Sequence, residues 1–407
     1  MSREDRRDRR RLACYRAVLA GATLLMVGLS WPLWAASDAF PRIPFVAGWP
    51  EPGGRLAGAL AWILAGALAL VALGRGGRWD WLTSLIALAW LILGDQARLQ
   101  PWAQQYAVVA LAAACLPRGR ALGVARWYVV VLYAASALSK FDAAFVDELG
   151  ETFVATLARL VGRDAAGWSP GTRLAAALAL PTGELAVAVA LAVPRLRGWG
   201  LAGSMVQHGA TLAVLGPWGV DHSANVLIWN VAMALENLAL FWPAPGLWEP
   251  RPGASRAVVV LVVALVGLER WGWVDSWPAH ALYASHAERA AILWPEAAAD
   301  ALPPAIRRWL GPADAEGECR LDLTGWSRAA RGVPVYPQGR VACGIATALV
   351  ARYAPATGPM PRAILWGRAG LGRGTPRVRV KCVGLAALRR RGDRFLINAR
   401  PAPGFGR

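Results

Sequence analysis

The sequence predicts an all-α polytopic membrane bundle of about nine spans, followed by a small C-terminal α+β extracytoplasmic domain. Composition predicts the membrane location, because 56% of the 407 residues are apolar and only 17% are charged. A surface that faced water everywhere would carry more charge than this. The apolar residues also gather in many long runs rich in Ala, Leu, Val and Trp, as membrane-spanning helices do.

These runs place the expected spans along the first two thirds of the chain. Several are shorter than the roughly 20 residues that a perpendicular helix needs, so eight spans is the alternative count. The expected spans are 12–36, 55–74, 79–95, 104–116, 124–139, 173–193, 198–216, 223–242 and 256–268. The first follows an arginine-rich stretch but has no persuasive cleavage site, so we expect it to be retained.

Arginine predicts the orientation, because short cytoplasmic loops hold an excess of Lys and Arg. The N-terminal tail is rich in arginine, and so is every second loop. Those loops carry Arg75, Arg78, Arg118, Arg120, Arg126, Arg195, Arg197, Arg251 and Arg256. We therefore expect a multi-pass protein of the cell membrane, with a cytoplasmic N-terminus and an extracytoplasmic C-terminal domain. One span fewer would reverse the side of that domain.

The net charge of +18 does not indicate nucleic-acid binding, since the arginines are spread over loops between spans, where they suit anionic lipid head groups. The lipid bilayer is the expected partner. No Cys-x-x-Cys spacing exists and the histidines lack a third ligand, so no metal site is expected. A disulfide between two of Cys319, Cys343 and Cys382 is left open.

The pattern changes near residue 268, which divides the chain into a bundle, 1–268, and a polar domain, 269–407. Within the domain, 341–353 has helical spacing, 377–383 alternates like a strand, and 394–398 is expected to be a second strand.

The segment 141–172, between the fifth and sixth expected spans, has apolar residues at helical spacing opposite acidic ones. It is either an amphipathic lid that lies flat on the membrane or an ordinary connecting helix packed on the bundle.

Lys140 is the first candidate catalytic residue. It is one of two lysines in a chain whose other basic residues are arginine, and it ends an apolar helix. A lysine in a dry pocket can lose its proton, whereas arginine stays charged. Tyr133 and Ser136 share its helix face, so a hydroxyl pair and an amine point to one place. The alternatives are a lysine that reaches the head groups, or an ion pair with Asp142 that would keep the amine charged.

Glu184 and His208 each lie about ten residues into successive spans, so we expect them at similar depth and within contact. Such a pair would fix the imidazole tautomer and suit proton transfer, or it would simply join two helices. Asn230 lies on a stripe with Asn237, where amides either bind a substrate carbonyl or quinone oxygen or clamp neighbouring helices.

The loop 94–106 is dense in hydrogen-bonding groups and includes Arg98, Gln100 and Trp102. Arg98 either pairs with Asp95 in a surface bridge or offers its planar fork to a carboxylate substrate.

These stretches resemble the HTTM family, the membrane domain shared with vitamin K-dependent gamma-carboxylases and with many bacterial proteins. The resemblance is carried by 95–102, 136–142, 207–208 and 228–230. It implies that Lys140, in Lys-Phe-Asp where those carboxylases have Lys-Leu-Asp, is the base that starts the oxygenation of a reduced, vitamin K-like quinone. His208 resembles the inward-facing histidine of the family. The C-terminal domain departs from the family, because it is far smaller than the domain of the eukaryotic carboxylases.

Three functions follow as hypotheses. The first is a quinone-dependent oxygenase or carboxylase that uses Lys140 as base, with Glu184 and His208 as further catalytic residues. The second is a non-enzymatic anchor whose domain binds a cell-envelope partner through its clustered arginines. The third is a carrier of a small hydrophobic molecule.

Overall fold

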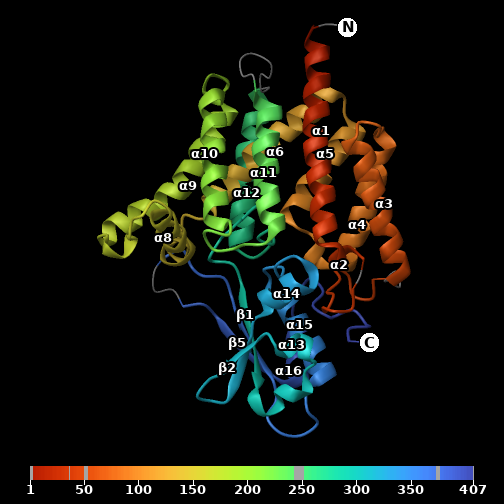
Figure 1. Cartoon of the computed structure of the whole chain (residues 1–407), viewed down its shortest axis with the longest axis vertical. Coiled ribbons are helices and arrows are strands. Elements are labelled where there is room, and N and C mark those ends of the chain that lie inside the picture. The colour runs from red at the N-terminus through yellow and green to blue at the C-terminus, as the bar shows by residue number, and fades with distance from the viewer. Residues whose placement is uncertain (1–2, 36, 50–53, 243–251, 373–375, 407) are drawn as a thin grey trace.

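The computed structural model describes residues 3–35, 37–49, 54–242, 252–372 and 376–406. A bundle of long helices forms one end of the molecule, and a domain with a β-sheet forms the other (Figure 1). The N-terminal end of α1 lies at the far end of the bundle from this domain.

Each expected span falls on a helix, and successive helices run in opposite directions along the bundle (Figure 1). The helices are α1 (Arg3–Leu29), α3 (Gly54–Ala72), α4 (Arg78–Gly94), α5 (Pro101–Cys115), α6 (Arg118–Leu138), α9 (Pro170–Ala192), α10 (Arg197–Leu215), α11 (Ala224–Phe241) and α12 (Pro252–Arg270). The first ends earlier than expected, because Pro32 cannot continue α1 and instead lies in the first turn of a separate short helix, α2 (Trp31–Trp34).

The count of nine spans is not supported. Among the described residues, four helices are long and apolar enough to cross a membrane: Arg9–Leu29, Arg118–Leu138, Pro170–Ala192 and Ala224–Phe241. A fifth apolar helix, Leu56–Ala72, is shorter. The chain is therefore a mainly helical protein with several membrane-competent helices, and the remaining helices complete the bundle around them.

The segment between α6 and α9 folds against the domain-facing end of the bundle (Figure 1). It contains α7 (Ala143–Phe145), a π-turn (Val146–Gly150), α8 (Glu151–Leu160) and a 3-10 turn (Ala165–Gly167). Helix α8 contacts both α9 and α10. Its apolar face therefore packs on the bundle, as the amphipathic pattern of this segment predicts.

The C-terminal domain is built on a five-stranded antiparallel sheet of order β2-β3-β1-β4-β5. Its strands are β1 (Arg289–Pro295), β2 (Leu310–Ala313), β3 (Glu318–Leu321), β4 (Arg362–Trp366) and β5 (Arg379–Val383). The helices α13 (Pro304–Arg307), α14 (Leu323–Arg331), α15 (Gly339–Tyr353) and α16 (Gly384–Gly392) gather on one side of it, as Figure 1 shows.

The expected helix at 341–353 and the expected strand at 377–383 are confirmed by α15 and β5. The expected strand at 394–398 is wrong, because these residues form turns and bends. The backbone of Asn398 accepts a hydrogen bond from Gln96, and its side chain donates to the carbonyl of Pro44. Its polar groups join the domain to bundle loops instead of pairing in a ladder. Cys319, Cys343 and Cys382 are all free.

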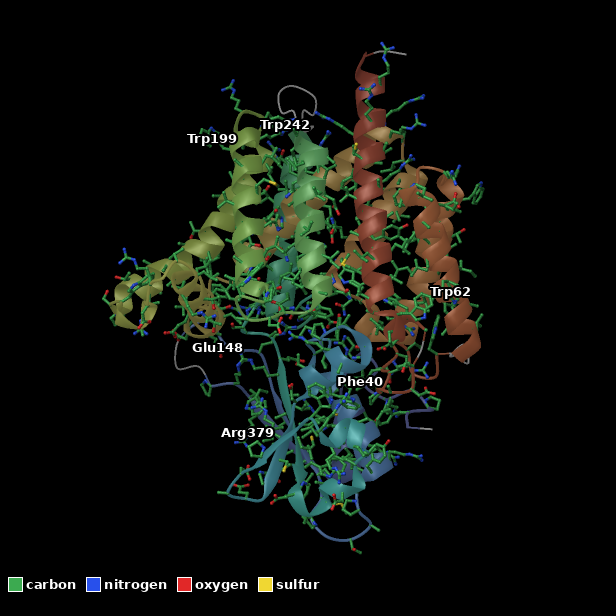
Figure 2. The ribbon with its side chains drawn as sticks, viewed as in Figure 1. Phe40, Trp62, Glu148, Trp199, Trp242 and Arg379 are labelled. Atoms are coloured by element: carbon green, nitrogen blue, oxygen red, sulfur yellow. The ribbon has the colours of Figure 1, made fainter. Side chains whose placement is uncertain are left out.

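The bundle loops also supply part of the core of the domain. Phe40, labelled in Figure 2, and Ile43 follow α2, are each 1% exposed and pack in one cluster with Trp294, Trp326 and Ile345. Burial of large apolar side chains at this seam stabilises the join by roughly 1.5–3 kcal/mol for each side chain. The seam therefore fixes the domain against the helices above it.

Candidate functional site

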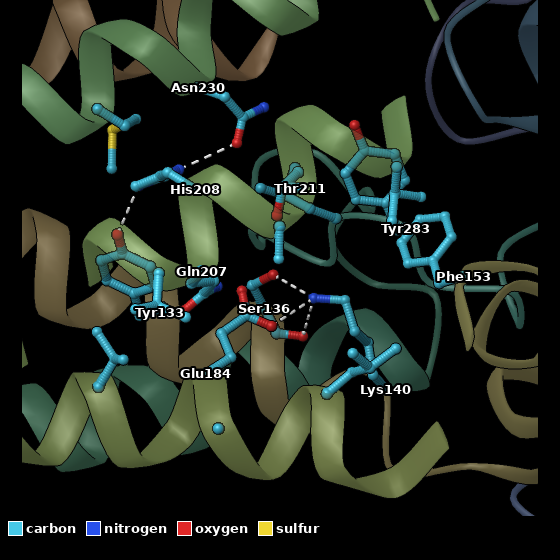
Figure 3. A pocket seen from close by; sticks show the side chains of 18 of the residues that line it. Tyr133, Ser136, Lys140, Phe153, Glu184, Gln207, His208, Thr211, Asn230 and Tyr283 are labelled. Atoms are coloured by element: carbon cyan, nitrogen blue, oxygen red, sulfur yellow. Dashed lines mark hydrogen bonds and ion pairs between the residues drawn. The ribbon is translucent and has the colours of Figure 1, made fainter. Parts of the chain in front are cut away.

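A cavity of about 460 Å³, which we call the first cavity, lies among α6, α8, α9, α10 and α11, and Figure 3 shows its lining. Most of that lining is apolar. The sequence-predicted residues that line it are Tyr133, Ser136, Lys140, Glu184, His208 and Asn230. Helix packing thus gathers six of the ten predicted site residues around one space.

Lys140 is paired with Glu184 in the wall of this cavity. Its amine lies 2.6 Å from Oε2 of Glu184 and 2.6 Å from Oγ of Ser136, and it also donates to the Ser136 carbonyl at 3.1 Å. The side chains are 7% and 11% exposed. Lys140 therefore lies just after the end of α6 with its amine turned inward, and its partner is Glu184 rather than Asp142.

His208 sits in a second hydrogen-bonded group of the same wall. Its Nδ1 lies 3.0 Å from Oδ1 of Asn230, and its Nε2 lies 2.6 Å from the hydroxyl of Tyr133. An amide oxygen only accepts, so Nδ1 carries the proton and the Tyr133 hydroxyl donates to Nε2. Asn237 then donates to the Tyr133 oxygen at 2.9 Å. The expected contact between Glu184 and His208 is replaced by these two separate groups, which we call the polar wall.

Phe153, Gln207, Thr211 and Tyr283 also line the cavity and are labelled in Figure 3, although none of them was a predicted site residue. Of these, Gln207 lies in 207–208, one of the stretches that carry the family resemblance. Gln207 and Thr211 are four residues apart on α10 and share a face, a spacing that the sequence displays. Within the described part of the chain, Oε1 of Gln207 is buried without a hydrogen-bond partner. Phe153 of α8 lines the cavity, and α8 packs on α9 and α10 as a connecting helix of the bundle would.

Asp142 is not among the residues that line the first cavity, and its side chain instead joins the domain to the bundle. Its carboxylate contacts Nδ1 of His286 at 2.8 Å and Arg270 at 3.0 Å, and it caps the backbone N–H of Phe145. Nε2 of His286 contacts Glu269 at 2.9 Å. We call Asp142, Glu269, Arg270 and His286 the clamp.

Charge sets the protonation of the clamp. Burial opposes ionisation of both partners, but hydrogen bonds from His286 and from a backbone N–H hold the pKa of Asp142 below its usual value. Hydrogen bonds to Asp142 and Glu269 outweigh burial and raise the pKa of His286 above its usual value. The imidazolium is therefore held between two carboxylates, of which Asp142 lies two residues after Lys140 in the chain.

Arg98, Gln100 and Trp102 lie away from the first cavity and make structural contacts. Arg98 is 3% exposed and donates to the carbonyls of Leu33, Leu91 and Trp34 at 2.8, 2.7 and 3.4 Å. Gln100 donates to a carbonyl of the preceding turn, and Trp102 packs on Trp34. Asp95 pairs with Arg331 of the domain. Arg98 is therefore too buried to form a surface ion pair, and its guanidinium is bonded to backbone carbonyls instead of being offered to a substrate carboxylate.

We expect Arg98→Lys to lower the free energy of unfolding by about 2 kcal/mol, because a lysine cannot reach three separate carbonyls and leaves buried acceptors unpaired. Thermal unfolding of the purified protein in detergent measures the change. Arg320→Lys is the matched control, since Arg320 is exposed on the sheet. An equal effect of the two substitutions would contradict this account of Arg98.

Comparison with protein-family models, with curated proteins and with solved structures gives no match for this chain.

Proposed function

We propose that this membrane protein binds a reduced quinone, or a molecule of the same chemical class, in the first cavity and moves protons at its ring oxygens. The observation that carries the proposal is the polar wall, in which an ion pair and a tyrosine–histidine–asparagine group face one apolar space. Such a combination of apolar lining and a few convergent polar groups is typical of cofactor sites. We place the N-terminus in the cytoplasm and the domain outside, on the arginine distribution.

The lining residues suit both the polar ring and the apolar isoprenoid tail of such a molecule. The Glu184 carboxylate and the unpartnered Oε1 of Gln207 can accept a hydrogen bond from a ring hydroxyl, and Tyr133 lines the same cavity. Apolar side chains that suit an isoprenoid tail include Leu132, Phe145, Leu157, Leu180, Val187, Val206 and Val214. The resemblance to the HTTM family, with its vitamin K-dependent members, points to the same class of cofactor.

The ion pair changes the role of Lys140. Its amine gives all three hydrogen bonds to Ser136 and Glu184, so the carboxylate of Glu184 is the group that would accept a proton from a bound hydroxyl. The neighbouring amine of Lys140 would stabilise negative charge that develops at this end of the cavity. The His208 imidazole receives a proton at Nε2 by way of Tyr133. When bound, a reduced quinone would supply two electrons to molecular oxygen, the co-reactant that an oxygenation requires.

Binding of menaquinone-4 to the full-length protein in detergent tests this function. We expect saturable quenching of tryptophan fluorescence, weakened at least tenfold in the paired variant Lys140→Met/Glu184→Leu, which removes both charges together. Ser139→Ala is the control, because Ser139 adjoins Lys140 but bonds only to the Ser136 carbonyl. Equal affinity in all three proteins would end the proposal. Menaquinone in lipid extracts of the purified protein would support it.

A second candidate is an anchor that presents the domain to an acidic envelope protein. Arg320, Arg379 and Lys381 are exposed on the sheet and have no ion-pair partner among the described residues. Register places all three on the side of the sheet away from its buried core residues. Crosslinking of the full-length protein in membranes at low and high salt tests this candidate, and only a salt-sensitive acidic partner would support it.

A further inference from the structure

A second cavity of about 750 Å³ lies on the other side of α6, against α5 and α12. We propose that it binds a long-chain alcohol, with the hydroxyl at the domain-facing end and the hydrocarbon chain along α6 and α12. This site is independent of the quinone proposed for the first cavity. It rests on unpaired polar atoms at one end of the second cavity, on the lack of charge there, and on the apolar groove that continues from it.

Three side chains at one end of the second cavity have polar atoms without a partner in the described structure. They are Oε1 of Gln104, the hydroxyl of Tyr128 and Nδ1 of His280. Tyr128 and His280 are 7% and 3% exposed. The amide nitrogen of Gln104 is fixed on the carbonyl of Pro278 at 3.0 Å, which leaves its oxygen free. A buried polar atom that lacks a partner costs about 1–3 kcal/mol, so three such atoms together indicate that a hydrogen-bonding ligand occupies this end of the cavity.

His280 is held at this place by a backbone conformation that is unfavourable for a residue with a side chain. His280 has φ of +58°, in the left-handed region that non-glycine residues seldom adopt. Its ring meets the ring of Tyr128 edge to face, with 5.1 Å between centroids. Tyr283, three residues on, has φ of +56° and lines the first cavity. One strained segment of the domain therefore reaches into the bundle and contributes to both cavities.

The polar end carries no charge, which selects a neutral ligand. Among the described residues that line the second cavity, Arg120 in the first turn of α6 is the one charged side chain. It lies about 12 Å along the helix axis from Tyr128, at 1.5 Å per residue. Burial lowers the pKa of His280 to about 4, so its imidazole is neutral at physiological pH.

A hydroxyl group meets these requirements with a single oxygen. It accepts a hydrogen bond from one partner and donates another, so it can accept from Tyr128 while it donates to the Gln104 oxygen or to a nitrogen of His280. A carboxylate or phosphate would only accept, and it would be buried without a cation beside it, which is costly. An ether or ester oxygen would leave the Gln104 oxygen unpaired.

The remaining lining suits one hydrocarbon chain. It is made mainly of apolar side chains, namely Val108, Leu116, Val124, Trp127, Val131, Ala257, Val258, Leu261 and Leu265. Gly119 and Gly123 are four residues apart on α6 and share a face, so the groove has no side chains there. A chain that runs along this face stays in the apolar part of the bundle, with its hydroxyl toward the domain.

Equilibrium binding of tritiated geranylgeraniol to the full-length protein in detergent tests the proposal. We expect saturable binding, at least tenfold weaker competition by geranylgeranyl methyl ether, which cannot donate, and a five- to tenfold loss of affinity in Tyr128→Phe. Because the hydroxyl of Tyr128 is unpaired without ligand, Tyr128→Phe should not lower the thermal midpoint of the free protein. A purely structural role for that hydroxyl predicts the opposite.

Two further variants locate the binding. Gly123→Leu should fill the groove and abolish binding, while Tyr133→Phe, in the first cavity, should leave it unchanged. Absence of saturable binding would overturn the proposal, as would equal affinity for the methyl ether, since water would then account for the unpaired atoms. Loss of binding in Arg120→Gln without loss in Tyr128→Phe would also overturn it, by indicating an anionic head group at the opposite end.

Discussion

Replacing Lys140 by methionine is expected to lower the free energy of unfolding by about 3 kcal/mol, because the buried carboxylate of Glu184 then has no cation beside it. The amine lies 2.6 Å from that carboxylate, and both side chains are largely buried. Thermal unfolding in detergent measures the loss. Lys381→Met is the matched control, because the other lysine is exposed on β5 and is expected to change stability by less than about 0.5 kcal/mol.

The paired variant Lys140→Met/Glu184→Leu is expected to regain most of the lost stability, since it removes the second charge instead of leaving it buried alone. Comparison of the single variant with the paired variant distinguishes a buried ion pair from a lysine directed to the lipid head groups. If the amine were directed to the head groups, as its place at a helix end allows, Lys140→Met would be as mild as Lys381→Met and the paired variant would show no recovery.

Loss of the clamp is the second large effect. His286→Ala removes the group that contacts Asp142 at 2.8 Å and Glu269 at 2.9 Å, so it leaves two buried carboxylates with fewer partners. We expect a loss of about 3 kcal/mol near pH 6. Limited proteolysis should show cleavage near residue 271, where the domain leaves α12, before any cleavage within the bundle.

The pH dependence of this loss has a definite sign. The pKa of His286 is raised in the folded protein, so its stabilising contribution is complete below its unfolded value of 6.5 and is lost as pH rises through the folded value. The pKa of Asp142 is lowered, so its contribution is complete above 3.8 and is lost only as pH falls through its folded value. The difference between wild type and His286→Ala should therefore be largest between about pH 4 and 6.5 and shrink above.

His222→Ala provides the opposite control. Burial and the nearby Arg328 lower the pKa of His222 to about 4, so the folded state excludes the proton that the unfolded chain binds below 6.5. The free energy of unfolding of the wild type should therefore fall more steeply with decreasing pH than that of His222→Ala. A clamp variant that followed the same trend as His222→Ala would contradict the assignment of His286 as an imidazolium.

The helices were predictable from sequence because long apolar runs have few alternatives in a membrane. The polar residues of the first cavity were predictable for a related reason, since a polar side chain in an apolar helix must meet partners or line a cavity. The pairing was not predictable. Lys140 and Glu184 lie 44 residues apart, and only the packing of α6 on α9 decides that Glu184, rather than the nearby Asp142, reaches the amine.

Residues contributed by the domain were harder still to foresee. His280, Tyr283 and His286 follow α12 without helical or strand periodicity, and two of them depend on a strained backbone. The four strands before β5 were also missed. Strands β2 and β3 are four residues each, and β1 has consecutive buried residues instead of alternation. Neither the length of an apolar run nor a two-residue period therefore predicts these strands.

Photolabelling with a diazirine analogue of menaquinone tests the central claim most directly, because it reports where a quinone lies in the folded protein. We predict saturable labelling of 132–140, 179–187 and 203–214, competed by unlabelled menaquinone-4 and lost in Lys140→Met/Glu184→Leu. Labelling confined to other segments, or labelling that menaquinone-4 does not compete, would contradict a quinone site in the first cavity.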